Sequence, residues 1–336
     1  TPTVQYITSS NSTIDTTSLT TIISSTAYGT FTMGTGATNL FTKQLILQNN
    51  PTTTFSSYGK TSGGQIISII IQNTLYIGGT FLSPLGNYSL AYNIVTNIWS
   101  NPFGSGVSNG INPSINYGVY SLAAIGNVLY VGGNFKTVNG NSWNHIAAFD
   151  TLTNTWTNPF GTGLDNYCYA LLTIGPVLHM SGSFTTANGV SSRMYASFNT
   201  ISNTWNTIGT QLSGGQWIAY AMTNIGSMLY IGGGFTVVNG TTGPGVAAYN
   251  TTSNTWNYPF GSGLTLSSTY CRSLANIGNT LYIGGDFTAA GGSTNNKYLA
   301  TFNTTTNTWG TLGYTSSITS QNSILPVGSI LYNTVG

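Results

Sequence analysis

The chain offers few side chains that could carry out acid–base or metal chemistry. It has 336 residues, 3% of them charged, and it contains no glutamate. Proton-transfer catalysis needs a carboxylate, imidazole or similar group within hydrogen-bond reach of the reacting atoms. The aspartates lie far apart and the histidines are lone residues: Asp15, Asp150, Asp165, Asp286, His145 and His179. This sparse set predicts a non-enzymatic protein without a metal or another cofactor.

Three of these residues have a structural interpretation. Asp150 stands where three related segments have asparagine, so we expect it to form a turn by accepting backbone hydrogen bonds. His179 replaces the tyrosine of a repeated apolar strand, which predicts a buried packing residue. His145 begins another predicted strand and is a weak metal candidate on its own.

The two cysteines occupy the same place in two repeated segments, TYCRSL and NYCYAL. Equivalent positions two repeats apart should not touch, whereas a disulfide needs Cα atoms within about 7 Å. We therefore expect Cys168 and Cys271 to be two buried thiols rather than a bridge.

The weak, evenly distributed charge narrows the possible partners. The formal net charge is +2 and the basic residues are spread along the chain, so no basic stripe for a phosphate backbone is predicted. No apolar run approaches the roughly 18 residues of a membrane span, and the N-terminus looks processed rather than like a signal peptide. We expect neither a nucleic-acid partner nor a membrane span. Because titratable groups are few, we also expect a fold nearly indifferent to pH between about 2 and 8.

A Gly-Gly segment recurs at intervals of about 50 residues. Its five near-copies are LYIGGTF (75–81), LYVGGNF (129–135), LHMSGSF (178–184), LYIGGGF (229–235) and LYIGGDF (281–287). Each copy lies in a unit that predicts four short strands, the last of them around a tryptophan. Because glycine has no Cβ, we expect the pair to permit close backbone approach and unusual φ angles. We expect the recurring tryptophans and the aromatic residues seven positions before them to be apolar wedges between neighbouring units.

These motifs, above all NTLYIGGDF followed by LATFNTTTNTWGTLG, resemble the kelch-type β-propeller repeat family, in the variant found in cell-surface and cell-wall proteins. The resemblance covers about residues 64–336 and implies an all-β propeller of four-stranded blades. It does not imply one function, because kelch propellers include galactose oxidase, adaptors and adhesins. The copper chemistry of galactose oxidase would need converging tyrosines and histidines that His145 and His179 do not supply.

The ends of the sequence predict six blades. The C-terminal NSILPVGSILYNTVG reproduces the first two strands of a unit, and residues 40–64 resemble the last two. We expect these strands to pair in a shared blade that closes the ring and removes exposed sheet edges. The predicted domains are a Thr/Ser-rich N-terminal extension (1–27) and a single propeller (28–336).

The loops after the Gly-Gly strand vary most, together with the connections between units, and in a propeller both lie on one face. Variable loops on a rigid scaffold are where binding usually resides. Aromatic residues beside neutral polar ones can stack on and hydrogen-bond to neutral glycans. Alternatively, the tyrosines could line or plug the central channel of the propeller. The candidate ligand-binding residues are Trp143, Trp217, Tyr117, Tyr120, Tyr169, Tyr220 and Arg272.

Five Asn-x-Ser/Thr sequences are candidate glycosylation sites: Asn11, Asn87, Asn239, Asn250 and Asn303. Together these features favour an extracellular, cell-surface or virion-surface propeller that recognises a glycan or a surface protein. The alternative is a structural subunit of a filament, sheath or virion, in which residues 1–27 add a strand to an identical neighbour. An oxidase-like enzyme is a minor alternative.

Overall fold

The computed structural model describes a chain whose regular secondary structure is almost wholly β-strand. It describes residues 3–7, 66–82, 87–96, 98–108, 118–206, 211–265, 270–312, 321–327 and 330–335. Five antiparallel sheets have four strands each, and each is formed by one repeat of the sequence. We number these sheets 1 to 5 in chain order.

The strands of each sheet follow one another outward in chain order. Sheet 1 contains β2 (Ile66–Ile71), β3 (Thr74–Leu82), β4 (Asn87–Asn93) and β5 (Ile98–Ser100). Sheet 2 contains β7 (Gly118–Ile125), β8 (Val128–Asn134), β11 (Ile146–Asp150) and β12 (Thr155–Thr157). Sheet 3 contains β13 (Cys168–Ile174), β14 (Val177–Gly182), β17 (Tyr195–Asn199) and β18 (Thr204–Asn206). Sheet 4 contains β20 (Ala219–Ile225), β21 (Met228–Gly233), β24 (Val246–Asn250) and β25 (Thr255–Asn257). Sheet 5 contains β27 (Cys271–Ile277), β28 (Thr280–Gly285), β30 (Leu299–Asn303) and β31 (Thr308–Gly310).

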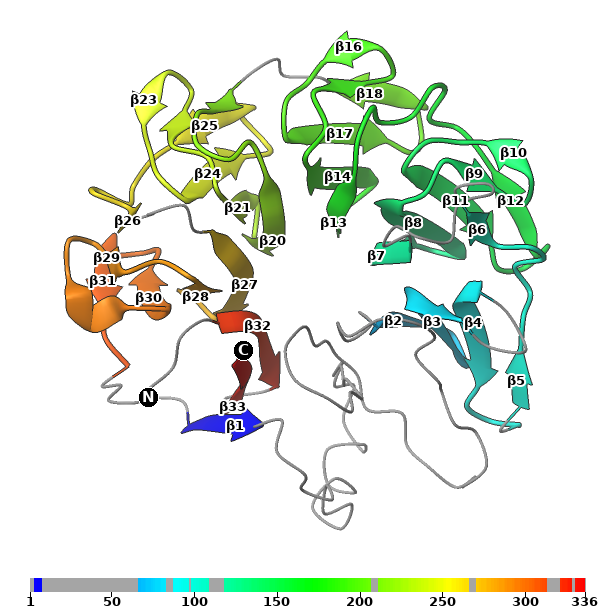
Figure 1. The fold of residues 1–336 in the computed structure, drawn as a ribbon, viewed down its shortest axis with the longest axis horizontal. Coiled ribbons are helices and arrows are strands. Elements are labelled where there is room, and N and C mark those ends of the chain that lie inside the picture. Colours follow the sequence, from blue (N-terminus) through cyan, green and yellow to red (C-terminus); the bar gives the residue numbers. More distant parts are fainter. Residues whose placement is uncertain are drawn as a thin grey trace.

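The sheets stand side by side around a common centre, with their first strands innermost (Figure 1). The first strands of successive sheets contact one another, β7 with β13, β13 with β20 and β20 with β27. The apolar core is therefore divided into clusters that lie between neighbouring sheets. The centre of the molecule is therefore lined by first strands from several repeats, including β7, β13, β20 and β27.

A three-stranded sheet brings the two ends of the sequence together. Strands β32 (Gln321–Val327) and β33 (Ile330–Val335) form an antiparallel pair, and β1 (Thr3–Ile7) pairs with β33 in parallel. The strands predicted from residues 40–64 lie outside the described residues. The partner of β33 instead comes from the segment that the sequence analysis placed in an N-terminal extension. The β-branched residues of TVQYI suit this role.

Short hairpins cover one end of the sheets. They comprise β6 (Val107–Ser108), β9 (Thr137–Val138), β10 (Asn141–Ser142), β15 (Thr186–Ala187), β16 (Val190–Ser191), β19 (Leu212–Ser213), β22 (Val237–Val238), β23 (Thr241–Thr242), β26 (Leu264–Thr265) and β29 (Ala289–Ala290), followed by the 3₁₀ turn η1 (Thr294–Asn296). Strand β6, which precedes sheet 2, pairs with β9 within sheet 2, and β19 and β26 pair equivalently in sheets 4 and 5. The variable loops and the connections therefore share one face, as predicted.

The Gly-Gly pair performs two kinds of close packing. A Cβ on Gly132 would lie 2.7 Å from the Sγ of Cys168 in the next sheet, and one on Gly78 would lie 2.5 Å from Cγ1 of Val119. The second glycine, Gly133, approaches the backbone of its own first strand, at the carbonyl of Gly118. The predicted close approach is confirmed. The predicted unusual φ is wrong for Gly132 and Gly133, which are not among the positive-φ glycines.

The tryptophans join neighbouring sheets by a hydrogen bond as well as by apolar packing. Trp156 packs against Phe149 of its own sheet and Phe103 of the preceding connection. Its Nε1–H donates to the carbonyl oxygen of Phe103 at 2.9 Å. Trp205 and Trp309 repeat the arrangement with the carbonyls of two further phenylalanines. The predicted packing of these tryptophans between neighbouring sheets is therefore confirmed, and the hydrogen bond to the phenylalanine carbonyl is an additional contact.

Sheet 4 lacks this polar contact, which allows a matched test. Trp256 packs against Tyr195 and Tyr249, but its buried Nε1 has no partner among the described residues. Trp156→Phe should therefore lower the free energy of unfolding by about 1 kcal/mol more than Trp256→Phe, because only the first removes a hydrogen bond, whereas the second removes a buried N–H that has no partner among the described residues. Denaturant unfolding of both variants measures the difference. Equal costs would contradict a stabilising role for the hydrogen bond.

Candidate ligand-binding site

Four tyrosines form a continuous row at the first strands of sheets 2 to 5. Tyr120, Tyr169 and Tyr220 lie on β7, β13 and β20, and Tyr270 directly precedes β27. The ring centroids of Tyr120 and Tyr169 are 5.5 Å apart and the rings are nearly parallel, at 8°. Tyr169 lies 4.9 Å from Tyr220, which lies 5.2 Å from Tyr270. The row thus spans sheets 2 to 5 on the innermost strands (Figure 1). With Arg272 at its end, the row brings together four of the predicted binding residues.

The row residues are presented by a repeated irregularity of the first strand. Each first strand of sheets 2 to 5 contains a register shift, and the residue at its centre is unpaired with the second strand. These residues are Tyr120, Tyr169, Tyr220 and Arg272. A β-bulge re-aims the side chain of its extra residue. At the bulge, the backbone of the first strand closely approaches the second glycine of the Gly-Gly pair, as Gly118 and Val119 approach Gly133. The repeated Gly-Gly motif therefore helps to position the row.

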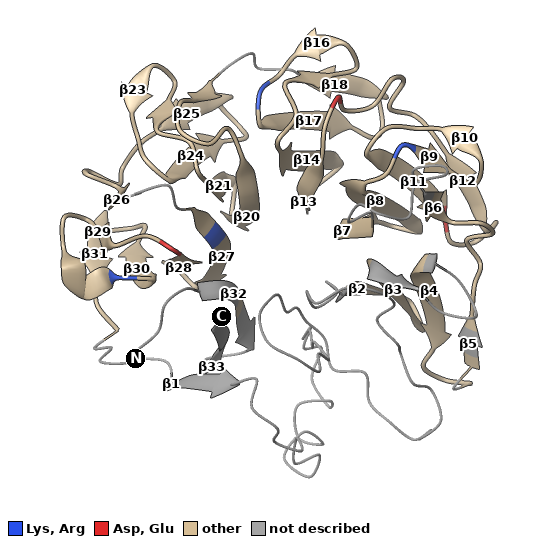
Figure 2. Cartoon of the chain, in the orientation of Figure 1, with Lys and Arg blue, Asp and Glu red and all other residues tan. Residues whose placement is uncertain are grey.

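An ion pair ends the row at sheet 5. Arg272 Nη2 lies 2.6 Å from Asp286 Oδ2, and Arg272 Nε donates to the same oxygen at 2.7 Å. The guanidinium carbon also lies 5.0 Å from the ring centroid of Tyr270 and 5.8 Å from that of Tyr220. Figure 2 shows this basic residue on β27 and the acidic residue at the end of β28. Because the pair is internally neutralised, the row carries no net charge.

Burial favours the neutral hydroxyl form of three of the row tyrosines. It raises the pKa of Tyr120 to about 12 and raises the pKa of Tyr169 and Tyr220 as well. Tyr120 and Tyr169 stack face to face, Tyr169 and Tyr220 are tilted, and Tyr220 and Tyr270 meet edge to face, so the row combines hydroxyl groups with ring faces and edges. Such groups can exchange hydrogen bonds with a neutral polar ligand.

Trp217 is the exposed aromatic residue nearest the row in sequence. It precedes β20, is 49% exposed and has a φ of 53°, which is uncommon for a bulky residue. The guanidinium carbon of Arg193, from the loop end of sheet 3, lies 4.4 Å from its ring centroid. One ring face is therefore held by a cation and the rest remains accessible. This arrangement fixes the indole at the variable-loop face.

The other predicted binding residues lie elsewhere. Trp143 follows β10 and lines a separate pocket at the outer edge of sheet 2. Tyr117 lies outside the described residues. Three features of the site were not predicted from the sequence: Tyr167, Tyr270 and the contact of Arg193 with Trp217. The tyrosine that precedes both cysteines was a signal for the first two.

The remaining titratable residues have structural partners. Asp150 Oδ1 accepts hydrogen bonds from the backbone N–H groups of Leu152 and Thr153, as predicted for a turn residue. His179 is 2% exposed and its Nδ1 lies 2.8 Å from the hydroxyl of Tyr195, which confirms a packed core residue. His145 is equally buried and its Nδ1 lies 3.2 Å from the carbonyl oxygen of Gly133.

The cysteines are two buried thiols without a disulfide, as predicted. Burial raises the pKa of both Cys168 and Cys271, so neither is an activated nucleophile. Within the described parts of the chain, no three His, Cys, Asp or Glu side chains gather to hold a metal ion. The same residues include no helix of the length and apolar character that crossing a membrane requires.

The candidate glycosylation sites fall in different settings. Asn239 is exposed in the turn between β22 and β23, and Asn87 begins β4. Asn250 and Asn303 accept backbone hydrogen bonds in the turns between the third and fourth strands. Asn11 lies outside the described residues. Carbohydrate attachment at these sites stays a prediction.

These turns lie on the face opposite the variable loops, and there sheets 1 to 3 expose apolar side chains whereas sheets 4 and 5 do not. At the second residue after the turn-forming Asn or Asp, sheets 1 to 3 have Val95, Leu152 and Ile201, which are 66%, 64% and 80% exposed. Sheets 4 and 5 have Thr252 and Thr305 at this position.

Comparison with known proteins supports the fold. Residues 218–333, a little over a third of the chain, match a family model described as "Rax2 C-terminal beta propeller domain". The chain is therefore an all-β protein with a β-propeller domain, which confirms that part of the fold prediction. No curated protein matches the chain. A solved structure titled "Crystal structure of the computationally designed Ika4 protein" is 12% identical over 59% of this chain and 96% of that one. Its TM-score of 0.38 is too low to support an inference.

Proposed function

We propose that the chain is a six-bladed propeller of kelch-like blades that acts in recognition or adhesion without enzymatic activity. Sheets 1 to 5 supply five blades, and the sheet of β1, β32 and β33 is the sixth, which joins the N- and C-terminal strands and closes the ring. The ligand is a neutral glycan or a neutral patch on a surface protein. The scarcity of charge and the candidate glycosylation sites support a location outside the cell or on a cell or virion surface.

The observation that carries this proposal is the placement of Trp217. An exposed indole costs solvation free energy, and this one also adopts a backbone conformation that is uncommon for a bulky side chain. The Arg193 guanidinium holds it at the loop face, a few residues before the hydroxyl-bearing row. An aromatic platform beside neutral hydrogen-bonding groups suits the apolar ring face and hydroxyls of a sugar.

A glycan array probed with the full chain tests the proposal. We expect binding to at least one neutral glycan, with at least a tenfold loss of affinity in Trp217→Ala. Ile201→Thr serves as the control, because it changes an exposed side chain on the opposite face to the residue type found in sheets 4 and 5. Absence of binding across the array, or equal binding by Trp217→Ala, would contradict glycan recognition at this face.

The exposed apolar turns favour a second candidate function, that of a subunit in an extracellular assembly. Val95, Leu152 and Ile201 stand at one position of three neighbouring sheets, where they could contact a second copy. Electron microscopy and mass photometry of the purified chain would reveal such an assembly. If it exists, Leu152→Thr combined with Ile201→Thr should weaken it, whereas Trp217→Ala should not.

A further inference from the structure

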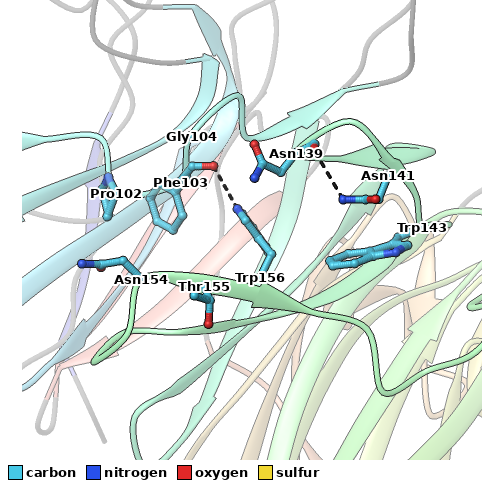
Figure 3. A pocket seen from close by; sticks show the side chains of 9 residues that line it. All are labelled: Pro102, Phe103, Gly104, Asn139, Asn141, Trp143, Asn154, Thr155 and Trp156. Atoms are coloured by element: carbon cyan, nitrogen blue, oxygen red, sulfur yellow. Dashed lines mark hydrogen bonds between the residues drawn. The ribbon is translucent and has the colours of Figure 1, made fainter.

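A pocket of about 380 Å³ lies at the outer edge of sheet 2, next to the connection from sheet 1 (Figure 3). Its lining has no charged side chain and combines three aromatic residues with three asparagines, a threonine, a proline and a glycine: Pro102, Phe103, Gly104, Asn139, Asn141, Trp143, Asn154, Thr155 and Trp156. Ligand pockets in proteins typically measure about 300–1,000 Å³, so this one suits a small ligand. It is separate from the tyrosine row, which lies on the innermost strands.

Part of the pocket belongs to the repeat and part does not. Phe103, Asn139 and Trp156 recur between sheets 2 and 3 as Phe160, Asn188 and Trp205, with the same hydrogen bonds. By contrast, sheet 3 has Val190 and Ser192 at the positions of Asn141 and Trp143. The fold therefore does not require an amide and an indole there, and their presence in sheet 2 needs another reason.

The unused groups of these side chains match a sugar. Asn139 Oδ1 accepts from the backbone N–H and hydroxyl of Ser105, which leaves its amide N–H₂ to donate. Asn141 makes a single long hydrogen bond of 3.4 Å to the carbonyl oxygen of Asn139, which leaves its own side-chain oxygen to accept. The half-buried Trp143 adds an indole, and Figure 3 shows the two amides beside the rings of Trp143 and Trp156.

We propose that this pocket binds one neutral sugar residue, or the end of a short neutral oligosaccharide. The apolar face of the sugar packs on Trp143, and adjacent hydroxyls exchange hydrogen bonds with Asn139 and Asn141. The uncharged lining excludes anionic sugars and phosphates, because their charge would lose hydration without gaining a cation. This inference names a second site for the ligand class of the proposed function and rests on that proposal.

The test titrates the full chain with glucose, galactose, mannose, N-acetylglucosamine and their linear oligomers, followed by NMR saturation transfer and calorimetry. Trp143→Ser and Asn141→Val convert the pocket to the residues of sheet 3. We expect both to lose at least tenfold in affinity for a saccharide that the unmodified chain binds. Val190→Ala and Ser192→Ala, at the equivalent positions of sheet 3, should keep full affinity, and thermal melting confirms that every variant is folded.

The outcomes separate this inference from the proposed function. Loss of binding in Trp143→Ser with binding retained in Trp217→Ala would support the pocket as a distinct site. Binding that is lost in Trp217→Ala but unchanged in Trp143→Ser and Asn141→Val would overturn the pocket and leave the proposed function standing. Absence of binding to every saccharide would overturn both.

Discussion

Acidification from pH 7 to pH 4 should lower the free energy of unfolding by about 3 kcal/mol for each of two buried histidines. Burial lowers the pKa of His145 and of His179 to about 4, from an ordinary value of 6.5. Each imidazole is 2% exposed, so protonation in the folded state would place a cation where water cannot reach it. His179 Nε2 has no partner that could share the charge among the described residues.

The direction follows from proton binding in the two states. Between pH 6.5 and about 4 the unfolded chain binds protons at these histidines and the folded chain does not, so stability falls as pH falls. Below about pH 4 both states are protonated and this loss stops. The burial of both imidazoles revises the expectation from sequence that the fold is nearly indifferent to pH, because that expectation counted charges without knowing where the histidines lie. For a chain of this size the melting midpoint should drop by about 5–10 °C.

His145→Asn and His179→Gln should each remove about half of this pH dependence, measured by denaturant unfolding at pH 7, 5.5 and 4. Asparagine suits position 145 because it tolerates the positive φ of 63° found there. Asp150→Asn is the matched control, since asparagine occupies that turn in the other sheets and the substitution should leave the slope between pH 7 and 5.5 unchanged. A double histidine variant that still loses stability between pH 6.5 and 4 would contradict the assignment.

Much of the fold could be predicted because its determinants are local and repeated. The Gly-Gly strand, the aromatic residue of the third strand and the tryptophan of the fourth recur in register, so the sheets and their packing could be inferred. The pairing of β1 with β33 could not, because it joins residues from opposite ends of the sequence and no repeat marks it.

The site was predictable only in part, for a related reason. Alignment of the repeats shows that Tyr120, Tyr169 and Tyr220 occupy one position, but not that a bulge turns them into contact. Trp143 and Trp217 both stand outside the repeat, which the sequence showed correctly. Trp143 lies at the outer edge of its sheet and Trp217 near the inner edge of another. The residues of a loop do not show which edge of a sheet the loop covers, so this separation could not be predicted.

Gly133→Ala should destabilise the chain by about 3 kcal/mol or more, at the upper end of the cost of overpacking. Its new Cβ would overlap the carbonyl oxygen of Gly118 and lie 3.1 Å from the Cα of Val119. These are backbone atoms of the bulge that presents Tyr120, so no side-chain rotation relieves the clash. Gly132→Ala should cost less, about 1–3 kcal/mol, because its Cβ would meet chiefly the Sγ of Cys168 at 2.7 Å.

The two glycines can be told apart by adding Cys168→Ala. Sheets 3 and 4 already contain such a combination of a larger first residue and a smaller neighbour. Ser181 of sheet 3 takes the place of the first glycine, and Ala219 of sheet 4 stands where other sheets have cysteine or valine. In a double-mutant cycle followed by denaturant unfolding, Cys168→Ala should recover most of the loss caused by Gly132→Ala. It should recover none of the loss caused by Gly133→Ala, whose clash lies within its own sheet. Equal recovery of both would show that the second glycine packs against the neighbouring sheet and does not serve the bulge.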